Sequence, residues 1–165
     1  MLAYVDPGDT IVIATPCYPA YLGAAKIVDA NVVELPLRPE NDYLPDYDAV
    51  PHSVWSAAKL LFLNYPNNPI GATAVLPVYK QARALAEKFD FVVVRDLAYS
   101  GLALEPDCPT PSIMELPNAK DLAVEFHSFS KSYTMAGWRL GWVVGNREII
   151  TNLVKIKANM DFSAF

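Results

Sequence analysis

Short runs of β-forming residues alternate with stretches of helical period, and this alternation limits the possible folds more than any other feature of the sequence. Strands that alternate with helices build a largely parallel sheet with helices on both faces. The expected strands are Thr10–Ala14, Asn31–Leu35, Lys59–Leu63, Phe91–Val94, Leu122–His127 and Gly141–Gly145, and the expected helices are Ala20–Val28, Leu76–Phe89 and Arg147–Lys157. The sequence therefore predicts an α/β fold with a mostly parallel sheet sandwiched by helices.

The charge balance argues against one large class of partners. The 165 residues include 13 Lys and Arg against 18 Asp and Glu, a formal net charge of −5. Binding to nucleic acid requires clustered cations, and no apolar stretch reaches the roughly 18 residues that a membrane span requires. Cys17 and Cys108 are too few for a disulfide scaffold and lack metal-ligand spacing. We expect one cytoplasmic domain that binds neither nucleic acid nor a membrane.

Polar and aromatic residues follow four of the expected strands. In open α/β sheets, ligands bind outside the carboxyl ends of the strands, so these residues are expected to converge on one pocket. They are Tyr18 and Tyr21 after the first strand, Asn68 after the third, Asp96 and Tyr99 after the fourth, and Ser128, Ser130 and Lys131 after the fifth.

The residue types in this set suit one cofactor. Lys131 can form a Schiff base with a carbonyl compound, and a buried Asp96 would need a cation such as a protonated pyridine nitrogen. Asparagine and tyrosine side chains can donate to a phenolate oxygen, and Arg139 can bind a phosphate with two parallel hydrogen bonds. The ring of Tyr18 can stack on a heteroaromatic ring. Pyridoxal 5′-phosphate (PLP) has all of these groups.

Four motifs carry a resemblance to a known family. They are Asn68–Gly71 (NPIG), Asp96–Tyr99 (DLAY), Ser128–Lys131 (SFSK) and Gly137–Gly141 (GWRLG). In their order and separation the chain resembles the fold type I PLP-dependent aminotransferases of class I/II. The wording of Thr15–Tyr21 and Glu125–Tyr133 is most similar to the LL-diaminopimelate aminotransferase-like branch.

The resemblance implies catalytic roles for three residues. Lys131 would hold PLP as the internal aldimine and then move protons between the substrate and the cofactor. Asp96 would pair with the pyridine nitrogen, and Tyr99 would hydrogen-bond the phenolic oxygen.

The resemblance also implies a wider cofactor-binding set. Asn68 would join Tyr99 at the phenolic oxygen, Tyr18 would stack on the ring, and Ser128 and Arg139 would bind the phosphate. The roles of Ser130 and Tyr21 stay open.

The implied reaction moves an amino group between an amino acid and a 2-oxo acid, in a protein that forms homodimers. Two alternatives are a PLP lyase or synthase of the same fold and a non-catalytic PLP-domain fragment. Ile70 replaces the threonine usual in the family. The glycine-containing phosphate loop and the arginine that binds the substrate carboxylate are not found in the sequence. We therefore expect residues 1–165 to be the central part of the PLP-binding large domain, without the N-terminal phosphate-loop segment and the C-terminal small domain.

Each of these residues also has a purely structural interpretation. Asp96 could cap a helix, the Asn68-Pro69 pair could form only a turn, and Arg139 could be an ordinary salt-bridge partner. His52 and His127 have no Asp, Glu or Cys neighbours at ligand spacing, so no metal site is expected. We interpret His127 as a hydrogen-bonded structural residue and His52 as exposed.

Overall fold

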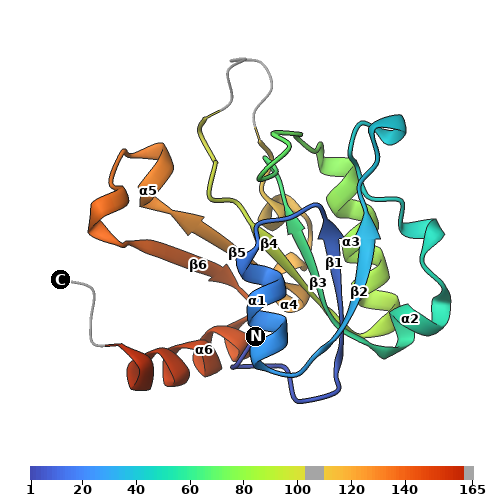
Figure 1. Ribbon diagram of the computed structural model, residues 1–165, viewed down its shortest axis with the longest axis horizontal. Coiled ribbons are helices and arrows are strands. Elements are labelled where there is room, and N and C mark those ends of the chain that lie inside the picture. Colours follow the sequence, from blue (N-terminus) through green and yellow to red (C-terminus); the bar gives the residue numbers. More distant parts are fainter. Residues whose placement is uncertain (103–109, 162–165) are drawn as a thin grey trace.

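A six-stranded sheet forms the centre of the computed structural model, which describes residues 1–102 and 110–161 (Figure 1). Cys108 lies outside the described residues. The strand order is β2-β1-β3-β4-β5-β6, and β1 to β5 are parallel while β6 is antiparallel to β5. The strands are β1 (Thr10–Thr15), β2 (Asn31–Pro36), β3 (Ala58–Asn64), β4 (Val92–Asp96), β5 (Ala123–Ser128) and β6 (Gly141–Gly145).

Helices cover both faces of this sheet. The α-helices are α1 (Ala20–Ile27), α2 (His52–Ala57), α3 (Leu76–Phe89), α4 (Ala119–Leu122), α5 (Phe129–Ser132) and α6 (Arg147–Met160). Short 3₁₀ turns cover Pro39–Asn41, Tyr47–Ala49, Ile113–Glu115 and Ala136–Trp138. Among the described residues, no helix is long and apolar enough to cross a membrane.

The two faces of the sheet carry separate hydrophobic clusters. On one face, Ala25 of α1 and Ile149 of α6 pack against β-strand residues such as Ile11 and Val94. On the other face, α3 contributes Tyr79 and Ala82, and α2 and α4 pack beside it. In Figure 1, α1 and α6 lie in front of the sheet and α3 lies behind it. Burial on both faces explains why the central strands are almost continuously apolar.

Most elements agree with the sequence-based expectation to within two residues, and the differences have structural consequences. Strands β3, β4 and β5 each extend past their apolar runs, so Asn64, Asp96 and Ser128 are the last residues of strands rather than loop residues. Strand pairing therefore fixes the backbone of all three residues: Asn64 lies in register with Asp96, and Ser128 lies in register with Gly141 of β6.

The last strand requires glycine at its end. Gly145 has a φ of +132°, and a Cβ atom there would lie 2.1 Å from the carbonyl oxygen of Ala123 on β5. No other residue type could keep this close approach of the two backbones.

The antiparallel direction of β6 returns the chain along β5 after the segment that contains Lys131 and Arg139.

Candidate active site

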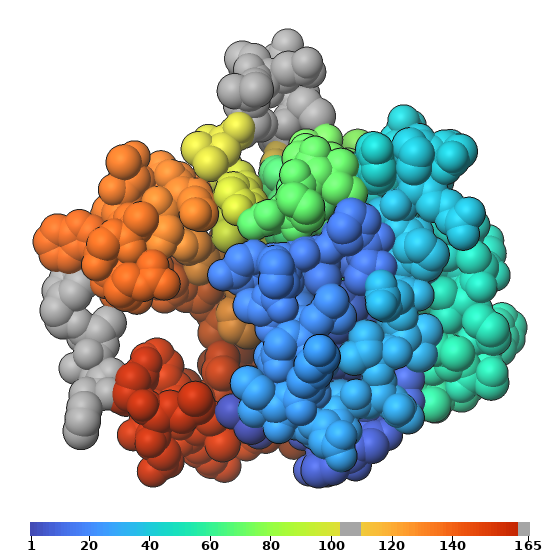
Figure 2. Space-filling view, in the orientation of Figure 1, coloured from blue at the N-terminus to red at the C-terminus, as the bar shows by residue number. Residues whose placement is uncertain are grey.

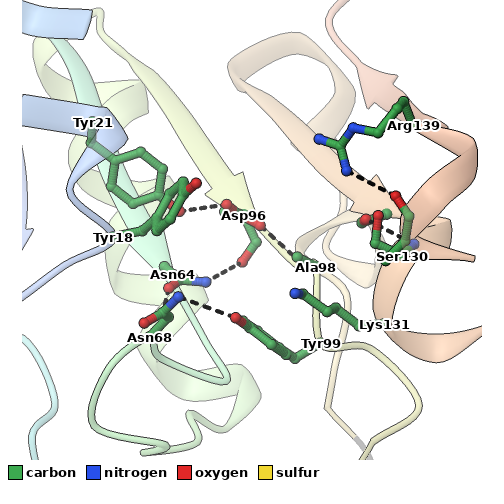
Figure 3. A pocket seen from close by; sticks show the side chains of 12 residues that line it. Tyr18, Tyr21, Asn64, Asn68, Asp96, Ala98, Tyr99, Ser130, Lys131 and Arg139 are labelled. Atoms are coloured by element: carbon green, nitrogen blue, oxygen red, sulfur yellow. Dashed lines mark hydrogen bonds between the residues drawn. The ribbon is translucent and has the colours of Figure 1, made fainter. Parts of the chain in front are cut away.

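A cavity of about 300 Å³ lies at the carboxyl ends of the parallel strands, at the lower end of the roughly 300–1,000 Å³ of small-ligand pockets. Segments that follow β1, β3, β4 and β5 meet there, seen as adjacent blue, green, yellow and orange surface in Figure 2. The cavity is lined by Tyr18, Tyr21, Asn64, Asn68, Asp96, Ala98, Tyr99, Ser128, Ser130, Lys131, Ala136 and Arg139 (Figure 3). All seven residues expected to bind or react with the cofactor are in this set.

Asp96 is held by hydrogen bonds on both carboxylate oxygens. Its Oδ1 accepts from the backbone N–H of Ala98 at 2.9 Å, and its Oδ2 accepts from the hydroxyl of Tyr21. Its backbone carbonyl accepts from Nδ2 of Asn64 at 3.2 Å. The bond to Ala98 resembles the capping role that the sequence left open. It still leaves the carboxylate exposed to the cavity, so capping and ligand binding are compatible.

Tyr21 is the site residue whose contacts the sequence did not reveal. It lies in the first turn of α1, 75 positions before Asp96. Its ring packs against Phe62 of β3 at 5.5 Å between centroids and against the edge of Tyr18 at 5.8 Å. Burial raises the pKa of the Tyr21 hydroxyl above its usual value, and the neighbouring Asp96 charge raises it further. The sequence placed Tyr21 after the first strand, among the residues expected at one pocket, but gave no signal for its bond to Asp96.

Asn68 and Tyr99 form a pair on the next side of the cavity. Nδ2 of Asn68 donates to the Tyr99 hydroxyl at 3.1 Å. The backbone N–H of Asn68 donates to Oδ1 of Asn64 at 2.9 Å, which fixes the start of the loop. The Asn68-Pro69 segment is therefore a turn, as one interpretation held, and the turn directs an amide and a phenol into the same space.

Lys131 projects into the cavity from the short helix α5. The hydroxyl of Ser128 caps this helix by accepting from the backbone N–H of Ser130 at 3.1 Å. The hydroxyl of Ser132 donates to the carbonyl of Ser100, which ties α5 to the segment after β4. Nζ of Lys131 lies 5.8 Å from the centroid of the Tyr99 ring. The amine thus faces the Asn68–Tyr99 pair across the cavity (Figure 3).

Arg139 lies on the opposite side of the cavity from Asn68, in the connection between α5 and β6 (Figure 3). Its backbone is left-handed, with a φ of 55°, and its Nη1 donates to the carbonyl of Ala136 at 3.0 Å. The left-handed backbone ends the 3₁₀ turn and turns the chain into β6. This is the one hydrogen bond of the guanidinium to a described residue, which leaves most of its five N–H groups for an anionic ligand.

The charged groups of the cavity have no ionic partners within the part of the chain that the structure describes. Asp96, Lys131 and Arg139 form no salt bridge there, although all three line one cavity. Among the described residues, Arg139 is thus not the ordinary salt-bridge partner that one interpretation offered. A ligand with one cationic and one anionic group at its two ends would complement this arrangement.

A buried ion pair supports the site from the other face of the sheet. Arg95 and Glu125 are 0% and 1% exposed, and Nη1 of Arg95 lies 2.6 Å from Oε2 of Glu125. Glu125 also accepts from Ser112 at 2.8 Å, from the N–H of Ile113 at 2.9 Å, and contacts Nε2 of His127 at 2.9 Å. His127 is thus a hydrogen-bonded structural residue, as expected, and His52 is exposed. The pair joins β4 to β5 one residue before Asp96 and three before Ser128.

Removing one partner of this pair is expected to destabilise the fold strongly. Arg95→Met leaves Glu125 charged and buried, so the free energy of unfolding should fall by about 3–5 kcal/mol in urea titrations of the cofactor-free protein. Lys157→Met is the matched control, because the Lys157–Asp161 pair has the same 2.6 Å separation but side chains that are 56% and 61% exposed. This control should lose at most about 1 kcal/mol. Equal losses in the two variants would contradict the assignment.

This chain is similar to known proteins in both sequence and structure. The sequence matches the family described as aminotransferase class I and II over residues 1–165. It is 45% identical over 163 residues to the LL-diaminopimelate aminotransferase of Nitratidesulfovibrio vulgaris, covering 99% of this chain and 42% of that protein. A probable N-succinyldiaminopimelate aminotransferase from Thermus thermophilus superposes with a TM-score of 0.94 and 40% identity, covering 99% of this chain and 44% of that one.

The mostly parallel sheet, its helical layers and the neighbours among solved structures define the fold as that of a fold type I transferase, which confirms the fold prediction. The chain belongs to the aminotransferase class I and II family. Its similarity to the LL-diaminopimelate aminotransferases confirms the finer resemblance as well. The chain spans about 42% of the length of these curated relatives.

Proposed function

We propose that the cavity binds PLP and that the protein to which these residues belong is an aminotransferase. The observation that carries the proposal is a set of three charged groups in one cavity, a carboxylate, an amine and a guanidinium, that form no salt bridge with any described residue. Asp96 would bind the pyridine nitrogen, Lys131 the aldehyde carbon, and Arg139 with Ser128 the phosphate. Tyr18, which is 47% exposed, would cover the ring, and the Asn68–Tyr99 pair would bind the phenolic oxygen.

When bound, PLP supplies an aldehyde that condenses with amines and a protonated ring that withdraws electrons from the attached carbon. The residues of this chain would orient and activate the reacting groups. The Asp96 carboxylate would keep the ring nitrogen protonated. Nζ of Lys131 would take the proton from the substrate carbon and deliver it to the aldehyde carbon of the cofactor, from a helix that capping and the bond to Ser100 hold in place. The hydroxyl of Tyr99 would donate to the phenolic oxygen.

The substrates are proposed from the relatives. An amino acid would donate the amino group and a 2-oxo acid would accept it. LL-diaminopimelate is the first donor to test, because it is named in the curated relatives that are 45% identical. We further propose that residues 1–165 belong to the PLP-binding large domain of a cytoplasmic homodimer, as the family resemblance implies.

The test of the proposed function is PLP binding followed by reaction with an amino donor. PLP added to the purified protein should give the absorption of a lysine-bound cofactor. Addition of LL-diaminopimelate should convert the cofactor to pyridoxamine 5′-phosphate in a single turnover. Release of carbon dioxide or of a β-substituent would support a lyase or synthase instead. A protein that takes up no PLP would contradict the proposal altogether.

Arg139→Lys is expected to weaken PLP binding more than it slows turnover of the PLP-saturated protein. Lysine keeps the charge but loses the planar fork that binds phosphate with two bonds, so the dissociation constant should rise by about tenfold. Equilibrium titration of PLP measures this effect. Arg147→Lys is the control, because Arg147 is exposed at the start of α6, away from the cavity. An unchanged dissociation constant in Arg139→Lys would remove Arg139 from the phosphate site.

A further inference from the structure

We propose that Tyr21 is a positioning residue that acts through Asp96: its hydroxyl holds one carboxylate oxygen so that Asp96 faces the pyridine nitrogen of PLP. The inference rests on the proposed function, because it gives Tyr21 a role only if PLP binds in this cavity. It assigns a residue whose role the sequence motifs leave open, since Tyr21 lies outside all four of them.

The geometry leaves Asp96 little rotational freedom. The Tyr21 hydroxyl donates to Oδ2, and the N–H of Ala98 donates to Oδ1 at 2.9 Å. One of these donors is a backbone group of the segment after β4, and the other comes from α1 on the face of the sheet. A carboxylate accepts about four hydrogen bonds, so each oxygen keeps acceptor capacity for a further donor in the cavity. Two donors from separate elements therefore orient the carboxylate without saturating it.

Tyr21 is itself held in place by ring packing. Its ring is held between Phe62, at 5.5 Å and a 34° interplanar angle, and the edge of Tyr18, at 5.8 Å and 79°. Burial and the Asp96 charge raise the pKa of its hydroxyl, so the proton stays on Tyr21 in the neutral pH range. Tyr21 therefore stays a neutral hydrogen-bond donor to Asp96 and adds no second negative charge beside the carboxylate.

Tyr21→Phe should consequently produce a weaker form of the effect of losing the Asp96 charge. The ring and its packing remain, while a charge-assisted hydrogen bond is lost. We expect the single-turnover rate with an amino donor to fall by about tenfold, and the PLP dissociation constant to change by less than about threefold.

A double-mutant cycle separates this role from a general structural one. Tyr21→Phe, Asp96→Ala and the double variant are compared by single-turnover rate and, without PLP, by urea unfolding. If Tyr21 acts through Asp96, Tyr21→Phe should change neither the single-turnover rate nor the equilibrium constant of unfolding by more than about twofold in the Asp96→Ala background. Tyr4→Phe is the control: this phenol lies outside the cavity, is 38% exposed, and should leave the rate and PLP affinity unchanged.

The outcomes distinguish this inference from the proposed function. A wild-type protein that binds no PLP contradicts both. A wild-type protein that binds and reacts while Tyr21→Phe reacts equally fast contradicts only the role of Tyr21. A tenfold fall in both backgrounds also contradicts it, because Tyr21 would then act independently of Asp96. Absence of coupling in the unfolding of the cofactor-free protein would contradict the contact itself.

Discussion

Replacement of Lys131 by alanine is expected to abolish covalent attachment of PLP and to slow the single-turnover reaction by about 10²–10⁴-fold, the range for positioned acid–base groups. The proposed function gives Lys131 two roles at one atom, and Lys131 is the one lysine that lines the cavity among the residues that the structure describes. Borohydride reduction of the PLP-treated wild-type protein should leave the cofactor on the peptide that contains Lys131. Mass spectrometry of the same digest from Lys131→Ala should detect no modified peptide.

Lys155→Ala is the matched control for this experiment. Lys155 is an exposed lysine on α6, outside the residues that line the cavity, so its loss should change neither the modified peptide nor the rate. A wild-type digest in which the cofactor is found on another lysine would contradict the role of Lys131. Lys131→Ala with unchanged turnover would contradict it as well, because no other lysine lines the cavity among the residues that the structure describes.

The sequence was sufficient for the strands and for the position of the site because both depend on local patterns. In Thr10–Ala14, every apolar residue of the run is at most 4% exposed, as expected for a strand covered on both faces. Parallel strands bring their carboxyl ends to one edge of the sheet. That rule alone groups Asn68, Asp96 and Lys131, which the structure brings to the same cavity.

The direction of the last strand could not be predicted in the same way. Gly141–Gly145 is a short apolar run whose composition is the same for either direction, and the parallel pattern of the earlier strands gave no reason to expect a reversal. The direction depends on the compact connection 129–140, in which α5 and a 3₁₀ turn bring the chain back beside β5. These elements are only four and three residues long, too short for a periodic signal.

Contacts between side chains that are far apart in the chain could not be predicted from the sequence either. Tyr21 and Asp96 are 75 positions apart, and Arg95 and Glu125 are 30 apart. Strand register explains the second pair, because Arg95 and Glu125 are direct neighbours across β4 and β5. The available signal was a charged residue that follows an apolar run within each of the two strands, and it becomes informative once the strand order is known.

Asp96→Asn is expected to lower the single-turnover rate by roughly thirtyfold or more while weakening PLP binding much less. Asparagine keeps the shape of the side chain, and its carbonyl oxygen can replace Oδ1 as the acceptor for the Ala98 N–H. Its NH2 group takes the place of Oδ2 and cannot accept, so it would instead donate to the Tyr21 hydroxyl. It removes the charge that would keep the ring nitrogen protonated, so the ring would withdraw electrons less strongly from the reacting carbon. A thirtyfold slower reaction corresponds to about 2 kcal/mol in the activation barrier. Stopped-flow absorbance of the half-reaction and equilibrium titration of PLP measure the two effects separately.

The control for Asp96→Asn is Asp90→Asn, which removes the same charge away from the cavity. Asp90 ends α3 with a left-handed φ of 58°, a conformation that asparagine tolerates, so both rate and affinity should be unchanged. The comparison with Arg139→Lys then decides the roles. In the proposed roles, Asp96 would act on the electronic state of the ring, so its replacement should affect the rate, whereas Arg139 would bind the phosphate, so its replacement should affect affinity. If Asp96→Asn instead lowered mainly the PLP affinity and Arg139→Lys mainly the rate, the roles proposed for these two residues would be wrong.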